Sequence, residues 1–348
     1  MAKRKHELSF MNIICCLTVI FIHVNSEAIN VCRKGGLAFG LSYTLWQVAS
    51  FVVYGFIFLS GVKQFLSADR AFKPASYYWR RFKSILLPYL LWVCLYYAYD
   101  CATQVESFDL ANLRHYILTG DYVGHFYFVI IIVQFYVLMP LWLRLFKRVN
   151  ALFMLPLSLI LMNVFGTFLP NILGMVLPDF EFAYADRTFT AYLFYWAAGA
   201  YVGMNYDRAK ALFCENRRFI YVTFALIAAF SLATAYYSSV GEKYYTWLDN
   251  VMQMYRIAAV IALFTFSLGK VNGVCENKAV ALFDASSYNI YLCHCLLLKE
   301  INRLFGLYGV DGLAARYFVR AAAVFIIPSA LCMAYTLIKK SIKNRRLR

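Results

Sequence analysis

His23 is a titratable side chain inside an otherwise apolar stretch of the sequence, residues 8–29. A neutral imidazole can take a proton from a hydroxyl group and return it, which is what a general base must do. The same residue could instead be a packed histidine that is hydrogen-bonded to a neighbouring helix, because a buried polar group needs a partner. Both interpretations stay open from the sequence alone.

A compact cationic cluster, Arg80, Arg81 and Lys83, precedes the third apolar stretch. Arginine side chains fork onto phosphate oxygens, so the cluster could hold the phosphates of a nucleotide-like donor. The alternative is an exposed anchor that meets anionic lipid headgroups and contributes little to stability. Composition alone favours the anchor.

His294 lies between Cys293 and Cys295 in a later apolar stretch, a triplet that resembles a metal site. Adjacent residues of a helix point about 100° apart, so one helix cannot turn all three side chains onto one ion. We therefore predict no metal site, and we interpret His294 as a hydrogen-bonding or substrate-lining residue.

Three polar segments between apolar stretches, residues 103–125, 170–187 and 239–249, are rich in acidic and aromatic residues. Carboxylates can accept hydroxyl protons from a sugar while aromatic rings pack on its face. The alternative is the aromatic belt that Trp and Tyr form at a membrane interface.

The elements that must position these residues are apolar helices. The 348-residue chain is 62% hydrophobic and only 15% charged, which a soluble domain of this length does not match. Stretches near 20 residues long, enough to cross a hydrocarbon core of about 30 Å, recur from end to end. We predict an all-α, multi-pass plasma-membrane protein with about ten transmembrane helices, near residues 8–29, 41–63, 84–102, 126–144, 151–169, 189–206, 219–238, 249–269, 279–300 and 316–339.

The net charge of +16 follows the same pattern, because most Lys and Arg residues fall in alternate loops and in the tail from about residue 340. Basic loops mark the cytoplasmic side, so we place both termini in the cytoplasm. The distribution argues against a nucleic-acid partner.

Several short motifs occur along the chain in an order that is similar to one known family. They are the first apolar stretch with Asn12 and His23, the segments Phe56–Gly61, Arg80–Tyr89, Gly124–Phe128 with Tyr127, Tyr195–Gly199, and Ser287–His294 with Tyr291. Together they resemble the acyltransferase-3 family over nearly the whole chain, as a single transmembrane domain spanning residues 1–348.

The resemblance implies transfer of an acetyl or succinyl group from cytoplasmic acyl-CoA, most often acetyl-CoA, to a hydroxyl of a glycan outside the membrane. The donor is a co-substrate, and no cofactor is bound. His23 would be the catalytic residue, and Arg80, Arg81 and Lys83 would bind the donor. The residues implied for the acceptor side or a pore are Asn12, His125, Tyr127, Tyr291 and His294.

Two positions depart from the family pattern. Asn12 stands where the family has an arginine, eleven residues before His23, and Ser84 stands where a second arginine would complete a basic pair. The rival interpretation is a transporter or flippase for a lipid-linked glycan or exopolysaccharide. Transporters often show paired halves with interrupted spans, and we find no such pairing.

Overall fold

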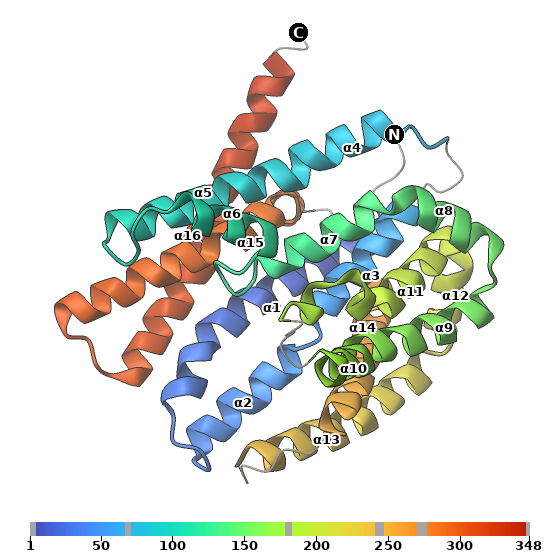
Figure 1. Cartoon of the computed structure of the whole chain (residues 1–348), viewed down its shortest axis with the longest axis horizontal. Coiled ribbons are helices and arrows are strands. Elements are labelled where there is room, and N and C mark those ends of the chain that lie inside the picture. The colour runs from blue at the N-terminus through green and yellow to red at the C-terminus, as the bar shows by residue number, and fades with distance from the viewer. Residues whose placement is uncertain (1–4, 67–70, 178–182, 241–246, 270–276, 346–348) are drawn as a thin grey trace. The chain divides into compact units, whose positions relative to one another are not determined.

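The computed structural model describes residues 5–66, 71–177, 183–240, 247–269 and 277–345. Every regular element within these ranges is a helix (Figure 1), which confirms the predicted all-α class.

The helices form two compact units, and α3 (Val52–Phe65) contributes residues to both. Unit 1 comprises Met1–Phe56 and Asp207–Arg348, with α1 (His6–Val31), α2 (Leu37–Ala49), α12 (Tyr206–Glu215), α13 (Arg217–Val240), α14 (Leu248–Gly269), α15 (Lys278–Tyr308) and α16 (Leu313–Arg345). Unit 2 comprises Ile57–Tyr206, with α4 (Pro74–Arg81), η1 (Phe82–Leu86), α5 (Leu87–Ala102), α6 (Leu110–Thr119), α7 (Tyr127–Val137), α8 (Met139–Arg148), α9 (Ala151–Asn163), η2 (Val164–Phe168), α10 (Leu169–Val176), η3 (Ala185–Arg187), η4 (Phe189–Tyr192) and α11 (Leu193–Met204).

Each of the ten predicted spans overlaps a helix, but fewer helices satisfy the requirements for a span. Among the described residues, six helices are long and apolar enough to cross a membrane, or seven if α7 and α8, bent by 63°, count as one. The six are His6–Val31, Leu37–Phe65, Pro74–Ala102, Arg217–Val240, Leu248–Gly269 and Leu313–Arg345. The ten-span count and the cytoplasmic termini therefore stay predictions.

Helix α15 is not among the six although it has 31 residues. Polar side chains in its apolar middle, such as Asp284 and His294, lower its hydropathy. Polar groups at such positions are costly unless they have partners, and they usually mark function.

Helix α1 packs against most of unit 1, because it contacts α2, α14, α15 and α16. Its buried side chains, such as Met11, Cys15 and Ile20, recur at helical spacing on its packed side. In the same unit α13 and α14 lie side by side (Figure 1). His23 is thus on a helix with neighbours on several sides.

In unit 2, glycines let α3 and α11 approach closely. A Cβ built on Gly199 would lie 2.2 Å from the carbonyl oxygen of Phe58, and one on Gly61 would lie 2.8 Å from the carbonyl oxygen of Trp196. Small residues permit such backbone contact between helices in membranes. This explains why Gly61 and Gly199 stand at these places in two of the sequence motifs.

We expect Gly199→Ala to destabilise the protein by about 1–3 kcal/mol, the usual effect of inserting a methyl group where nothing can move aside. Gly306→Ala is the matched control, because no atom lies within 4 Å of a Cβ there and alanine favours a helix. Thermal unfolding in detergent would compare them. Equal midpoints for the two variants would contradict the close contact between α3 and α11.

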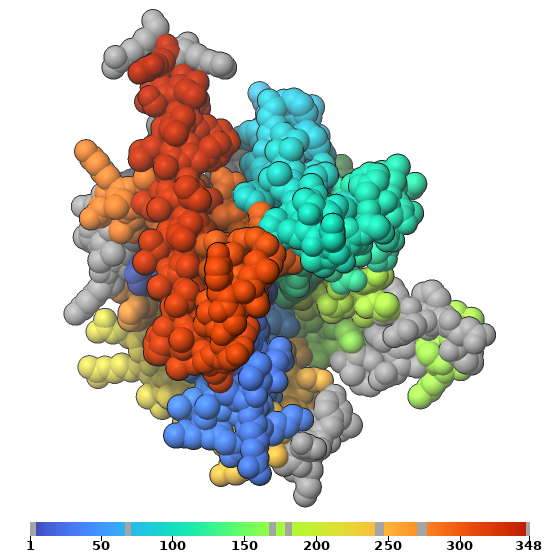
Figure 2. All heavy atoms as spheres, turned by 90° about the vertical axis from the view of Figure 1, so that its left-hand side faces the viewer, coloured from blue at the N-terminus to red at the C-terminus, as the bar shows by residue number. Residues whose placement is uncertain are grey.

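The basic tail continues the last helix. The last turns of α16 extend past α15, its neighbour in unit 1 (Figure 1 and Figure 2). Lys339, Lys340, Lys343 and Arg345 are exposed there. The sequence prediction ended this helix near residue 339, whereas the structure carries it to Arg345.

Candidate active site

A polar seam joins α1 to α15 inside unit 1. The side-chain amide of Asn12 donates to Asp284 Oδ1 and to Ser287 Oγ, both at 2.8 Å. Asp284 is thus the partner of the residue that replaces the family's arginine. An amide satisfies this carboxylate by hydrogen bonding alone, where an arginine would add charge neutralisation.

Farther along the same two helices, His23 faces His294. Their ring centroids are 5.2 Å apart, and His294 is completely buried. Tyr291 lies one helical turn before His294, with its ring centroid 6.3 Å away. Four predicted site residues, Asn12, His23, Tyr291 and His294, are therefore on these two packed helices.

The backbone of α15 fixes the orientation of the His294 ring. Its Nδ1 lies 2.8 Å from the carbonyl oxygen of Tyr291 and 3.2 Å from that of Ile290. A carbonyl only accepts hydrogen bonds, so Nδ1 carries the proton and Nε2 of the neutral ring carries a lone pair.

The cysteines on either side of His294 point differently, as the helical spacing predicted. Cys293 Sγ lies 3.6 Å from Cys332 Sγ on α16, whereas Cys295 Sγ lies 3.3 Å from Nε2 of His294. The ligand atoms of His23, His294 and Cys295 lie within 4.8 Å of one another, so these three could hold a metal ion. The absence of a metal stays a prediction.

A buried ion-pair cluster ties α1 to α16 one turn beyond His23. Glu27 pairs with Arg316 and with Arg320, and Arg320 is only 3% exposed. Arg320 also donates to the backbone carbonyl of His23 at 3.3 Å. The cluster holds the turn of α1 that carries His23.

The predicted donor cluster lies in unit 2, within a helix and not ahead of one. Arg80 and Lys83 are exposed; Arg80 Nε donates to the carbonyl of Ser76 at 3.2 Å, and Lys83 Nζ lies 4.4 Å from the ring centroid of Trp79. A π-helical turn, Phe82–Leu86, carries Lys83. Such turns are frequent at functional sites.

Arg81 differs from its two neighbours because it is half-buried. Its guanidinium lies over the rings of Tyr77 and Tyr136, at 5.3 and 4.8 Å, and donates to Gln64 Oε1 at 2.9 Å. The sequence predicted that Arg81 binds the donor, with an exposed anchor as the alternative; Arg81 is not exposed, and its donor role stays a prediction. Its aromatic contacts give it a packing role, so Arg80 and Lys83 are the better probes of donor binding.

His125 and Tyr127 also belong to unit 2, at the start of α7. His125 is 3% exposed and its ring centroid lies 4.6 Å from that of Phe126. Tyr127 is the first residue of the helix and is half-buried. These two residues and the cationic cluster are thus in one unit, and the His23–His294 pair is in the other.

Comparison with known proteins places this arrangement in a family. A profile described as an acyltransferase domain matches residues 5–338. The chain belongs to the acyltransferase-3 family. The match covers the polar seam, both histidines and the cationic cluster.

Relatives of this acyltransferase-3 protein carry a name that concerns polysaccharide export. The "Probable poly-beta-1,6-N-acetyl-D-glucosamine export protein" of Staphylococcus aureus (strain MSSA476) is 25% identical over 318 residues, covering 86% of this chain and 84% of the relative. The protein of the same name from Staphylococcus epidermidis is 26% identical over 310 residues, covering 86% and 83%. No solved structure matches the chain.

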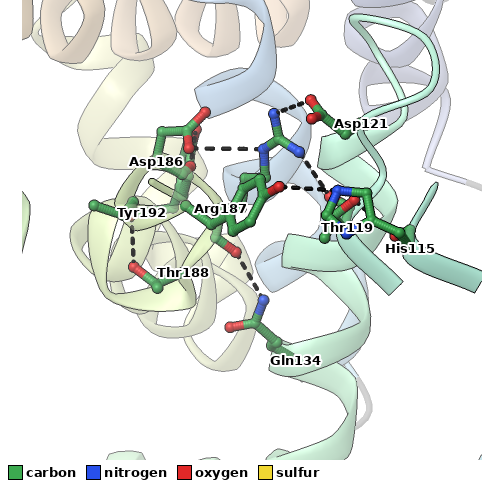
Figure 3. Close-up of polar contacts among 10 residues, drawn as sticks. His115, Thr119, Asp121, Gln134, Asp186, Arg187, Thr188 and Tyr192 are labelled. Carbon is green, nitrogen blue, oxygen red and sulfur yellow. Dashed lines mark hydrogen bonds and ion pairs between the residues drawn. The ribbon is translucent and has the colours of Figure 1, made fainter. Parts of the chain in front are cut away.

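The polar segments of this acyltransferase-3 protein in unit 2 are joined by Arg187 (Figure 3). Its guanidinium contacts Asp121 Oδ1 at 2.6 Å and Asp186 Oδ1 at 3.7 Å, and it donates to the carbonyl of Thr119 at 3.0 Å. The Arg187 carbonyl accepts from Gln134 Nε2 at 2.7 Å. Two carboxylates that the sequence offered for sugar binding therefore have a structural partner.

Further along the same region, the hydroxyl of Tyr122 donates to the buried carboxylate of Asp100. Burial and this hydrogen bond raise the pKa of Tyr122 above its usual value, so the phenol stays protonated as a donor. Parts of the other two acidic and aromatic segments, including Glu181, Glu242 and Tyr244, lie outside the described residues.

Sequence reasoning missed three residues of this site: Asp284, which pairs with Asn12, and Cys295 and Arg320, which contact the two histidines. An ionisable residue inside an apolar stretch is a signal in itself, and it could have singled out Asp284 and Arg320. Nothing in the sequence distinguishes Cys295 from the other cysteines in apolar stretches, because a buried cysteine packs like a small hydrophobe.

Proposed function

We propose that this protein transfers an acyl group, acetyl or succinyl, from cytoplasmic acyl-CoA to a hydroxyl of a glycan outside the cell membrane. The observation that carries the proposal is the pairing of His23 with the buried His294 in a chain of the acyltransferase-3 family. The relatives' name supports an exopolysaccharide built of N-acetylglucosamine as the acceptor.

In this proposal His23 removes the proton of the acceptor hydroxyl while the hydroxyl oxygen attacks the thioester carbonyl of acyl-CoA. A C–O bond forms, the C–S bond breaks, and the CoA thiolate takes the proton from His23. General-base catalysis of this kind is worth roughly 10²–10⁴ in rate. Arg80 and Lys83 would hold the phosphates of the donor, because both are exposed cations.

We expect the double variant Arg80→Gln, Lys83→Gln to raise the KM for acetyl-CoA by roughly tenfold or more, since charge-assisted hydrogen bonds to phosphate are lost. The unfolding midpoint should hardly change, because both side chains are exposed. The control is Lys340→Gln, Lys343→Gln, two exposed lysines at the end of α16. An unchanged KM in the Arg80→Gln, Lys83→Gln variant would mean that these residues do not bind the donor and only anchor the protein at the membrane.

The second candidate is export of a glycan across the membrane, favoured by the relatives' name. Polar residues such as Asn12, Asp284 and His23 would then line a path instead of doing chemistry. Pro156 in α9 and Pro328 in α16 are the helix-internal prolines within the described residues, and they do not form matching halves.

One comparison separates the two functions. Envelope glycans from cells with and without the protein would be analysed for O-acyl esters, and the polymer released outside would be quantified. Acyl transfer predicts esters that disappear with the protein and with His23→Gln. Loss of external polymer with no change in esters would instead favour export.

A further inference from the structure

We propose that His294 is the positioning residue for His23: its Nε2 accepts a hydrogen bond from the His23 ring and stabilises that ring when it becomes charged. The inference rests on the proposed function, in which His23 is the base. It assigns His294 a defined role in place of lining the site.

The backbone contacts of His294 determine which of its ring nitrogens is protonated. Nδ1 lies 2.8 Å from the Tyr291 carbonyl, so it must hold the proton, and a completely buried ring stays neutral unless it is paired. A neutral imidazole has one N–H and one lone pair. The lone pair is therefore on Nε2, the ring nitrogen next to the Cys295 thiol.

Two possible hydrogen-bond donors lie near the Nε2 lone pair, the His23 ring and the Cys295 thiol. The ring centroids of His23 and His294 are 5.2 Å apart, and their nitrogen ligand atoms lie within 4.8 Å. The thiol of Cys295, 3.3 Å from Nε2, is a weak donor. A charged His23 ring is a much stronger donor, because hydrogen bonds with an ionised partner are roughly twice as strong.

Neighbouring groups hold both histidines in place. Arg320 donates to the His23 carbonyl and is held in turn by Glu27, so the turn of α1 that bears the base is fixed. The α15 backbone fixes the His294 ring. Because the base is already oriented, proton transfer to it requires little further loss of conformational entropy.

Two substitutions at His294 separate positioning from packing. In His294→Gln the amide oxygen can reach the place of Nε2 and accept from His23, whereas in His294→Asn the amide N–H can only replace Nδ1–H toward the Tyr291 carbonyl. We expect His294→Asn to lower kcat about 10- to 100-fold, the value of a hydrogen bond to a charged group, and His294→Gln about threefold. Cys293→Ala is the matched control, because the Cys293 thiol points to Cys332 on α16 and not to the histidines, and it should keep kcat within about twofold. A kcat for His294→Asn that equals or exceeds that of His294→Gln would overturn the proposal.

A second measurement does not depend on activity. ¹⁵N shifts of labelled imidazoles in nanodiscs should show His294 protonated on Nδ1, with Nε2 accepting, and a shift of the His23 signals in His294→Asn but not in His294→Gln. His294 protonated on Nε2 would overturn the proposal. So would one zinc ion per chain lost in His294→Asn, because a metal would occupy both lone pairs. Inactive wild-type protein with the expected shifts would reject acyl transfer while supporting the histidine pair.

Discussion

His23→Gln should abolish transfer, with a loss of roughly 10²–10⁴ in kcat, while the protein folds and still binds acyl-CoA. Glutamine keeps a donor and an acceptor, so it can satisfy the polar contacts of a packed histidine. An amide does not take up a proton near neutral pH, so it cannot replace a general base. The measurement is acyl transfer by purified protein in nanodiscs, from acetyl-CoA to glycan from cells that lack the protein.

His6→Gln is the control for this experiment, because His6 is the first residue of α1 and stands 17 residues before His23. We expect its transfer to equal that of the wild-type protein. Donor binding measured on the same samples separates lost chemistry from lost folding. If His23→Gln transferred within a few-fold of wild type, His23 would have no part in the chemistry.

The helices were predictable because apolar stretches of sufficient length leave few alternatives, and each predicted stretch overlaps a helix. The limits of those helices were less predictable. The helix Pro74–Ala102 begins ten residues before the predicted stretch at residue 84. Pro74 suits the first helical position, and three aromatic residues, Tyr77, Tyr78 and Trp79, give the charged first turns an apolar surface. The charged residues beside these aromatic side chains are the reason that the predicted stretch did not include these turns.

The site was predictable as a set of residue types but not as a set of contacts. His23 and His294 were singled out because each is polar in an apolar stretch, yet only the packing of α1 on α15 shows that they form a pair. The same holds for Asn12 with Asp284 and for Glu27 with Arg320. Each pair joins residues far apart in the sequence, and no local pattern relates them.

Glu27→Gln should destabilise the protein by about 3–5 kcal/mol, because removing one partner of a buried ion pair leaves an uncompensated charge. Arg320 is 3% exposed and would lose its carboxylate while Arg316 remains beside it. Since Arg320 also holds the carbonyl of His23, transfer should fall as well. Thermal unfolding in detergent and transfer in nanodiscs would be measured on one preparation.

Two further variants test whether burial of the ion pair is the reason that Glu27→Gln loses stability. Glu300→Gln breaks a pair with Arg303 whose side chains are 31% and 45% exposed, so it should cost less than about 1 kcal/mol. Glu27→Gln with Arg320→Met removes both charges and should regain much of the stability, because apolar replacements of buried ion pairs are often neutral. Transfer should not recover with it, since methionine cannot donate to the carbonyl of His23. Equal losses in Glu27→Gln and Glu300→Gln would mean that the cluster beside His23 is hydrated and does not hold α1 in place.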